Sequence, residues 1–206
     1  VGKTAAAVNV AWLSACDALR TLLIDLDSQA AATFYLHVTP TKGIGRRELV
    51  KGGGKLRDGI CTTGYDNLHL LPAGKSLRNL DLSLDRASKS KTRLDKTFSM
   101  FSDEYDLLVV DCPANISLVA ENALRAADCV LVPVRPSTLS IRSYMDLEEF
   151  VARRRGKIDP RVLTPFFSMV EKRKRMHRDA MATFSQRYPS MLRSSIPYAS
   201  AVERMG

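Results

Sequence analysis

The sequence predicts an α/β fold, with a mostly parallel central sheet flanked by helices on both faces. Residues 107–110 and 129–132 are continuous apolar runs, which is typical of strands buried on both faces of a parallel sheet. Segments with helical periodicity lie between such runs, and this alternation predicts right-handed crossovers within an α/β domain. The length of 206 residues, 45% of them hydrophobic, is sufficient for a domain with its own core. We therefore expect residues 1–206 to form a single domain.

Five short apolar runs are the expected strands, at residues 22–24, 68–71, 107–110, 129–132 and 162–167. The first helix is the clearest, because apolar side chains recur every three or four residues and form one stripe that faces the core. That stripe consists of Ala5, Val8, Trp12, Ala15 and Leu19. Further helices are expected at 92–103, 118–127, 140–153 and 174–187. The glycine-rich stretch 39–64 is expected to be a flexible excursion.

The net charge of +9 is concentrated in one segment of the chain. Between residues 153 and 178, ten Lys or Arg face only Asp159 and Glu171, a balance of +8. Clustered cations are the usual footprint of a surface that binds nucleic acid or another polyanion. The alternative interpretation is a solvated loop and helix face. An anionic membrane surface fits less well, because the segment lacks interleaved aromatic residues and a wide apolar face.

Residues 1–206 lack the patterns typical of membrane-spanning, secreted and disulfide- or zinc-stabilised proteins. No apolar run approaches the roughly 18–20 residues that span a bilayer, and no charged leader followed by an apolar segment indicates secretion. The cysteines are scattered without a CxxC pair, which favours neither a disulfide framework nor a zinc site and suits a reducing cytosol. They are Cys16, Cys61, Cys112 and Cys129. We therefore expect a cytoplasmic protein with no membrane segment in residues 1–206.

A partial phosphate-binding motif opens the chain. Gly2-Lys3-Thr4 matches the end of the Walker A pattern GxxxxGK[ST], and the first expected helix follows at once. In such a loop the glycine lets backbone amides approach phosphate, the lysine neutralises β- and γ-phosphate oxygens, and the threonine hydroxyl binds Mg²⁺. The upstream glycines and the strand before them are absent. We expect a domain that lacks its first strand and the start of this loop.

Carboxylates follow two of the expected strands. Asp111 ends the run 107–110, as a Walker B aspartate does, and Asp25 and Asp27 follow 22–24. Ligands bind open α/β sheets at the carboxyl ends of strands. One carboxylate of the pair would reach the Mg²⁺ shell while the other orients an attacking water, since phosphoryl transfer depends on positioning and charge neutralisation. The alternatives are a cap or turn role for Asp111 and a solvated turn for the pair.

Five segments together resemble the ParA/Soj branch of the ParA–MinD family of deviant Walker ATPases. They are VGKTAAAVNVA, LLIDLDSQAAATFYL, LHLLPAG, YDLLVVDCPANISLVAENALRAADCVLVPVRPSTLSI and SIPYASAVERMG. The resemblance implies a P-loop fold with Lys3 on the phosphates, Thr4 on Mg²⁺ and Asp27 positioning the hydrolytic water. It also implies that Asp25 lies in the first switch and that Asp111 is the Walker B carboxylate, both near the metal.

The resemblance further implies that ATP and Mg²⁺ are bound. The implied nucleotide-binding residues are Gly2, Lys3, Thr4 and Ala5, with Met169, Val170, Pro197 and Tyr198 around the adenine. The signature lysine of the family loop KGGVGKTT, which reaches across an ATP-sandwiched dimer, would lie before Val1. Three departures, at Ala5, Ser28 and Ala114-Asn115, remove no phosphate or Mg²⁺ ligand and leave the hydrolysis rate open.

The implied function is ATP-dependent partitioning or positioning on DNA. Family members dimerise with ATP, bind DNA without sequence preference and are stimulated by a ParB-like partner, which implies a nucleoid-associated protein. The expected DNA-binding residues are Arg153, Arg154, Arg155, Lys172, Arg173, Lys174 and Arg175. Two alternatives stay open at this stage. One is a MinD-like ATPase that positions at membranes, and the other is a nucleotide-binding regulatory module with negligible turnover.

Overall fold

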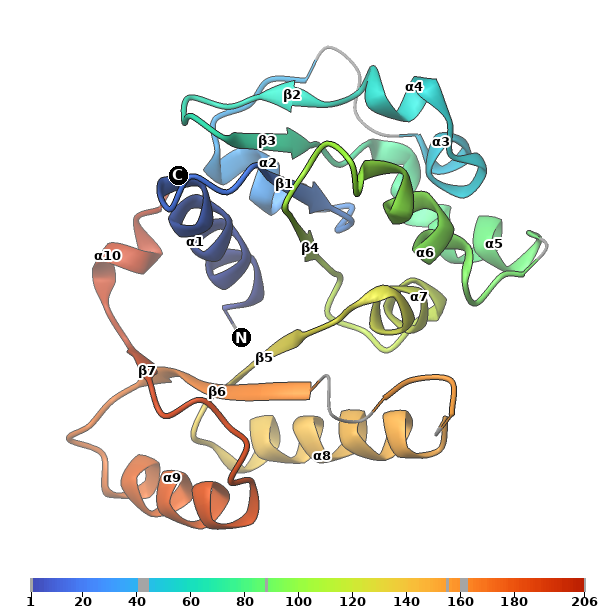
Figure 1. Ribbon diagram of the computed structural model, residues 1–206. Coiled ribbons are helices and arrows are strands. Elements are labelled where there is room, and N and C mark those ends of the chain that lie inside the picture. The colour runs from blue at the N-terminus through green and yellow to red at the C-terminus, as the bar shows by residue number, and fades with distance from the viewer. Residues whose placement is uncertain (1, 41–44, 88, 155, 160–162, 206) are drawn as a thin grey trace. The chain divides into compact units, whose positions relative to one another are not determined.

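The computed structural model describes residues 2–40, 45–87, 89–154, 156–159 and 163–205 (Figure 1). They form two compact units: residues 4–126, and residues 127–205 together with Gly2 and Lys3. Each unit contains a sheet whose strands are mostly parallel and on which helices pack. The predicted α/β class is confirmed. The expectation of a single domain over 1–206 stays a prediction.

The sheet of the unit 4–126 has the strand order β2-β3-β1-β4. These strands are β1 (Thr21–Asp25), β2 (Cys61–Thr62), β3 (Leu68–Leu71) and β4 (Leu107–Asp111). The central strand β1 is buried along its whole length and pairs in parallel with β3 and β4, while β2 pairs antiparallel with β3 at the edge. All three apolar runs expected in this part of the chain are therefore strands. The apolar run of β1 is buried on both faces, whereas residues 107–110 of β4, which ends the strand order, are only half-buried.

Helix α1 (Lys3–Cys16) packs its small residues inward, which corrects one prediction. Its buried positions are Val8, Ala11 and Ala15, whereas the side chain of Trp12 is 39% exposed and lies edge-on to Tyr65. Val8 and Ala15 of the expected stripe are buried, but Ala11 is buried in place of Trp12, and Leu19 lies beyond the end of the helix and is exposed. Alanine side chains let a helix approach its neighbours closely, and the large indole is accommodated at the rim.

The other face of this sheet carries the larger core, formed with the helices that follow β1 (Figure 1). These are α3 (Arg46–Lys51), α4 (Gly54–Arg57), η1 (Lys75–Asn79), α5 (Leu80–Asp85), α6 (Arg93–Phe98), η2 (Ser99–Phe101) and α7 (Leu118–Ala126). Helix α2 (Ala31–Tyr35) also follows β1 but buries Ala32 and Thr33 outside this core. Leu22 and Ile24 of β1 meet the fully buried Phe101 in this core. The helices expected at 92–103 and 118–127 are confirmed in α6–η2 and α7.

The stretch 39–64 is not a flexible excursion where the structure describes it. It contains α3, α4 and β2, and the side chains of Leu49 and Leu56 are 0% and 1% exposed. Because of its many glycines, the sequence did not indicate these two short helices, each of which places one leucine in the core. Residues 41–44 of this stretch lie outside the described part.

The unit 127–205 contains the parallel sheet β5-β6-β7. Its elements are β5 (Val130–Val134), α8 (Thr138–Ala152), β6 (Leu163–Val170), α9 (Arg175–Arg187), β7 (Ser195–Pro197) and α10 (Ser200–Glu203). An aromatic cluster of Tyr144, Phe167, Phe184 and Tyr188 joins α8 and α9 to this sheet. The expected strands and helices of this region are confirmed within a few residues, except that position 162 lies outside the described part. In the described ranges, no helix combines the length and apolar character needed to cross a bilayer.

An ion pair ties the turn before β1 to the turn before β4. The guanidinium of Arg20 donates Nη2 to Oδ1 of Asp106 at 2.7 Å and Nε to Oδ2 at 3.0 Å, and its backbone amide donates to Oδ2 at 2.9 Å. These hydrogen bonds lower the pKa of the Asp106 carboxyl from 3.8 to about 2. Because the pKa is lower in the folded state, ionised Asp106 stabilises the fold above pH 3.8, and the contribution is lost as the pH falls toward 2.

Replacing Asp106 with asparagine is therefore expected to lower the urea midpoint at neutral pH. The difference from the wild type should narrow as the pH is lowered from 4 toward 2, where the wild-type carboxyl also loses its charge. Urea titrations at a series of pH values check this result. Asp103→Asn, at an exposed acid nearby, is the control. A difference that is constant across the acid range would contradict the linkage.

Candidate functional site

Two buried carboxylates end adjacent parallel strands of the four-stranded sheet. Asp25 closes β1 and Asp111 closes β4, and the two residues are direct partners in the strand register. Their exposed fractions are 0% and 2%, so both carboxylates are withdrawn from bulk water. The pairing continues one residue further, since the amide of Leu26 donates to the carbonyl of Asp111 at 2.9 Å. This edge is where ligands bind in α/β folds.

Asp25 organises the loop that follows β1. Its Oδ2 accepts hydrogen bonds from the amide of Thr33 at 3.0 Å and from the Thr33 hydroxyl at 2.8 Å, and its Oδ1 accepts from the amide of Asp27 at 3.2 Å. Burial raises the pKa of the Asp25 carboxyl, while the hydrogen bonds from Thr33 and Asp27 oppose that rise. These contacts give Asp25 a positioning role in the loop 27–33. Its predicted role near a metal stays a prediction.

Asp27 is the more accessible carboxylate of the three. It is half-buried, and its Oδ1 accepts a hydrogen bond from the amide of Gln29 at 3.0 Å, which forms a local turn. The carbonyl of Asp27 accepts from the amide of Ala30, whose φ of 55° lies in the left-handed region. Asp27 is thus held at the start of a tight turn that follows the buried Asp25, and its role in positioning water stays a prediction.

Thr33 belongs to this site and was missed by the sequence reasoning. It lies at the first turns of α2 with an exposed fraction of 6%, and its hydroxyl also accepts a hydrogen bond from the amide of Ala73 at 3.3 Å. The hydroxyl therefore links the end of β1 to the segment after β3. The available signal was a hydroxyl residue eight positions after Asp25, which carries little information before the fold is known.

Thr33→Val is expected to destabilise the protein by about 1–3 kcal/mol. Valine keeps the shape of the side chain, but the buried Asp25 carboxylate loses one donor and the Ala73 amide loses its acceptor. Chemical denaturation measures the loss. Thr33→Ser, which keeps the hydroxyl, is the matched control and should retain most of the stability. Equal midpoints for Thr33→Val and the wild type would show that these hydrogen bonds contribute nothing.

Gly2, Lys3 and Thr4 stand at the start of α1. Gly2 has a φ of 69°, and a Cβ there would lie 3.0 Å from Oγ of Ser168, so this position favours glycine on two grounds. Lys3 and Thr4 form the first turn of a 14-residue helix, where unpaired amides face outward, and Ala5 follows them. The structure places Asp25, Asp27 and Asp111 at one sheet edge. The convergence of residues 2–4 on that edge stays a prediction.

The four residues expected around the adenine lie together at the carboxyl ends of β6 and β7. Val170 pairs with Pro197 in the strand register, and the amide of Tyr198 donates to the carbonyl of Val170 at 3.0 Å. Met169 has a φ of 55°, which breaks the regular register just before Val170. The ring of Tyr198 is 48% exposed and available for stacking. Contact with an adenine stays a prediction.

The described side chains fit a nucleotide-bound metal better than a metal held by protein alone. Across the described ranges, no three His, Cys, Asp or Glu side chains gather into a group that could hold an ion. Mg²⁺ in phosphate-transfer sites is usually held by one or two protein oxygens, with phosphates and waters as its other ligands. We call the sheet edge that carries Asp25, Asp27 and Asp111 the acidic edge. The Thr4 hydroxyl and one carboxylate of this edge match that smaller requirement.

The expected DNA-binding residues divide into two groups. Arg153 and Arg154 directly follow α8, and Lys172 to Arg175 follow β6. The eight residues of β6 therefore separate the two groups by roughly 25 Å. Figure 1 shows the two groups at opposite ends of the β6 strand. Arg155 lies outside the described residues. A segment that is continuous in sequence therefore does not form one continuous patch.

Most cations of these groups already have partners in the structure. Arg153 pairs with Glu149 at 2.5 Å, Lys174 with Glu171 at 2.6 Å and Arg175 with Asp179 at 3.6 Å, and Arg154 lies over the ring of Phe150 at 3.6 Å. Glu171 also lies 3.5 Å from Arg135, which follows β5. The ion pairs are exposed, so phosphate groups can compete for these cations at small cost.

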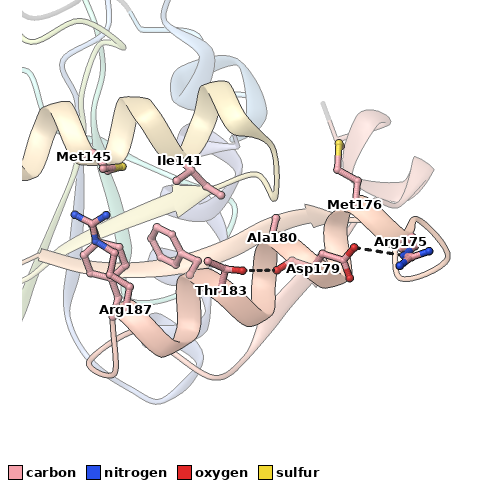
Figure 2. A pocket seen from close by; sticks show the side chains of 10 residues that line it. Ile141, Met145, Arg175, Met176, Asp179, Ala180, Thr183 and Arg187 are labelled. Atoms are coloured by element: carbon pink, nitrogen blue, oxygen red, sulfur yellow. Dashed lines mark hydrogen bonds and ion pairs between the residues drawn. The ribbon is translucent and has the colours of Figure 1, made fainter.

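A groove of about 600 Å³ runs between α8 and α9 (Figure 2). Ile141 and Met145 line it from α8, and Met176 and Ala180 line it from α9. Arg175 stands at one end with its partner Asp179, and Arg187 stands at the other. Apart from Arg175, the groove contains none of the residues predicted to bind nucleotide, metal or DNA.

Comparisons with known proteins identify the family to which the chain belongs. Residues 1–162 match the AAA_31 family, described as an AAA domain. The chain is 28% identical over 171 residues to the chromosome partitioning protein ParA of Caulobacter vibrioides, covering 79% of this chain and 62% of ParA. It thus spans less than two thirds of that relative.

Solved structures share the fold at lower identity. A cobyrinic acid a,c-diamide synthase from Mycobacterium smegmatis, with bound ADP and magnesium, has a TM-score of 0.85 at 23% identity over 98% of this chain and 83% of that chain. Apo McdA from Cyanothece has a TM-score of 0.85 at 21% identity with the same coverage. The resemblance predicted from the motifs is confirmed by the relatives and the fold together. With its match over residues 1–162, the chain belongs to the AAA_31 family, and its relatives place it among P-loop ATPases of the ParA–MinD type.

Proposed function

We propose that the protein is a Mg²⁺-dependent ATPase that hydrolyses ATP to ADP and phosphate. The observation that carries the proposal is the acidic edge at the carboxyl ends of β1 and β4, where Asp25 and Asp111 are register partners and Asp27 is hydrogen-bonded to Asp25. Membership of the P-loop family supports it, as do the ADP and magnesium bound to the mycobacterial neighbour.

In this proposal each residue has a separate role. Lys3 neutralises phosphate oxygens, the Thr4 hydroxyl and Asp111 hold Mg²⁺ with Asp25 beside them, and Asp27 orients the attacking water. Bound Mg²⁺ supplies charge neutralisation at the phosphates. The residues proposed to contact nucleotide are Gly2, Lys3, Thr4, Ala5, Met169, Val170, Pro197 and Tyr198. The helix N-terminus at Lys3 favours anions through its unpaired amides and dipole.

Release of phosphate from ATP, measured with and without Mg²⁺, tests the enzyme directly. We expect turnover that depends on Mg²⁺ and is lost in Lys3→Ala. Nucleotide binding without any phosphate release would contradict the ATPase and favour the regulatory module. The absence of both binding and release would contradict the nucleotide site itself.

We further propose that the ATPase acts in partitioning or positioning on DNA. The ParA relative supports this role, and the cations of residues 153–178 supply the electrostatic attraction. In this proposal ATP favours a homodimer, the dimer binds DNA without sequence preference, and a ParB-like partner stimulates hydrolysis and release. Such a protein would be cytoplasmic and nucleoid-associated.

The salt dependence of DNA binding tests the second proposal. If about five side chains of the segment 153–178 contact phosphates, log affinity should fall with log salt concentration at a slope near −4.5. Fluorescence anisotropy with unrelated duplexes measures both the slope and the lack of sequence preference. A slope near zero, or affinity for one sequence alone, would contradict non-specific DNA binding.

A further inference from the structure

A second cationic surface lies in the unit 4–126, far along the chain from residues 153–178. Arg47 and Lys51 of α3 and Lys55 of α4 are exposed, and Gly52, Gly53 and Gly54 lie between the two lysines. We call Arg47, Lys51, Lys55 and the three glycines the glycine-flanked surface. In the part of the chain that the structure describes, none of its three cations has an acidic partner, unlike Arg153, Lys174 and Arg175.

The one acid within residues 45–57, Glu48, is directed away from these cations. A Cβ on Gly45 would stand 1.8 Å from Oε2 of Glu48, so this carboxylate folds back over the start of α3. There it faces the unpaired amides of the first helical turn. Glu48 therefore does not neutralise Arg47 or Lys51, while the exposed Asp58 directly after α4 reduces the net charge around Lys55.

The backbone of this surface is held in place from α6 and η2. Arg93 donates to the carbonyl of Val50, and Thr97 donates to a carbonyl of α3 at 2.9 Å. The amide of Gly53 donates to Sδ of Met100 at 3.4 Å. The two lysines are thus presented from a fixed frame, which reduces the ordering cost when a ligand binds.

The three glycines leave the backbone between the two lysines without side chains. Gly52 and Gly53 have φ values of 68° and 108°, so the backbone itself favours glycine there. Gly54 has no such φ, and nothing lies within 4 Å of where its Cβ would stand. Neither backbone conformation nor packing requires glycine at position 54. A remaining reason for glycine is the close approach of another molecule to the backbone.

The chemistry of the surface fits a phosphate backbone. Its two nearest leucines, Leu49 and Leu56, are 0% and 1% exposed and point into the core. Within the described residues 45–57, Val50 is half-buried and no apolar side chain is exposed that could insert into a membrane or fill a pocket on a protein partner. Cations around a bare stretch of backbone can contact successive phosphates of a duplex without reading its bases.

We propose that the glycine-flanked surface is a second contact site for the phosphate backbone of duplex DNA, a proposal that rests on the proposed DNA-binding function. Arg47, Lys51 and Lys55 each bind a phosphate, and Gly54 lets the duplex approach the backbone. The site lies in a different unit from residues 153–178, so its contribution can be removed separately.

The test compares two triple variants with the wild type. Arg47→Ala/Lys51→Ala/Lys55→Ala removes the surface, and Arg86→Ala/Lys89→Ala/Lys91→Ala removes the same charge elsewhere in the unit. Three lost phosphate contacts should reduce the steepness of the log–log salt slope by about 2.7 for duplex DNA. The control triple should change the slope by less than about 1, since it removes long-range attraction without contacts.

Gly54→Ala provides a second readout that does not alter charge. Alanine is favoured over glycine in a helix, so the thermal midpoint should be unchanged or higher while DNA affinity falls. Circular dichroism melts of all variants accompany the anisotropy titrations. If the surface triple variant does not fold, Gly54→Ala decides the question.

The outcomes separate the two proposals. If the wild type binds DNA and the surface triple variant has the same salt slope, this site is overturned and the proposed function stays intact. The same holds if the salt slope changes equally in both triple variants. No DNA binding by the wild type would overturn both. Retention of the wild type on phosphatidylserine vesicles, lost in the surface triple while its DNA slope is unchanged, would assign the surface to membranes instead.

Discussion

Asp27→Ala is expected to lower the single-turnover rate of ATP hydrolysis by about 10²- to 10⁴-fold, the range in which a positioned proton acceptor contributes to catalysis. Asp27 is the half-buried member of the acidic edge, and its neighbours Asp25 and Asp111 are withdrawn from solvent. ATP affinity should change little, because the proposed role is toward water rather than toward phosphate. Rapid-quench measurement of phosphate release and equilibrium binding of ATP check the two halves of this prediction.

Asp27→Asn is the matched control for local structure. Asparagine keeps a side-chain oxygen that can accept the Gln29 amide, so the turn is preserved while the negative charge is lost. Both variants should therefore be slow. A fast Asp27→Asn with a slow Asp27→Ala would mean that Asp27 only shapes the turn, and equal rates in all three proteins would remove Asp27 from the reaction.

Lys3→Ala is expected to weaken ATP binding by about 30- to 5,000-fold. Lys3 is the first residue of α1, and its ammonium is proposed to pair with phosphate oxygens in a site of reduced water content. Loss of one partner of a desolvated charge pair costs about 2–5 kcal/mol, which corresponds to this range of affinity loss. Isothermal titration calorimetry with ATP measures the change.

Binding of adenosine is the internal control for Lys3→Ala. Adenosine lacks phosphates, so its affinity should be the same in the wild type and the variant if Lys3 acts on phosphate alone. Lys172→Ala, which removes an exposed lysine after β6, controls for net charge and should bind ATP like the wild type. Wild-type ATP affinity in Lys3→Ala would contradict the proposed phosphate contact.

The acidic edge was predictable because each of its strands is a short apolar run that ends in aspartate. The runs at 22–24 and 107–110 are both strands, and their parallel pairing places Asp25 beside Asp111. The acidic edge follows because local pattern and chain direction determine which strand ends share an edge. Only the resemblance to the ParA/Soj branch implied that residues 169–170 and 197–198 lie together, and β6 and β7 are neighbours.

Other features depended on tertiary packing that no local pattern contains. Trp12 fits the expected apolar stripe, yet the helix turns Ala11 inward and leaves the indole 39% exposed. The glycines of 52–54 suggested flexibility, whereas contacts from Arg93 and Met100 hold that backbone. The cations of 153–178 are contiguous in sequence, but the length of β6 divides them. In each case partners distant in sequence decided the outcome.

The central claim is that the opening residues and the acidic edge serve one triphosphate–magnesium site. The most direct test is binding of a non-hydrolysable ATP analogue with and without Mg²⁺, in the wild type, Lys3→Ala and Asp111→Asn. We predict that Mg²⁺ strengthens binding to the wild type, that Asp111→Asn loses most of this enhancement, and that Lys3→Ala binds weakly in both conditions. Equal enhancement by Mg²⁺ in the wild type and Asp111→Asn, with full affinity in Lys3→Ala, would show that these residues do not share a site.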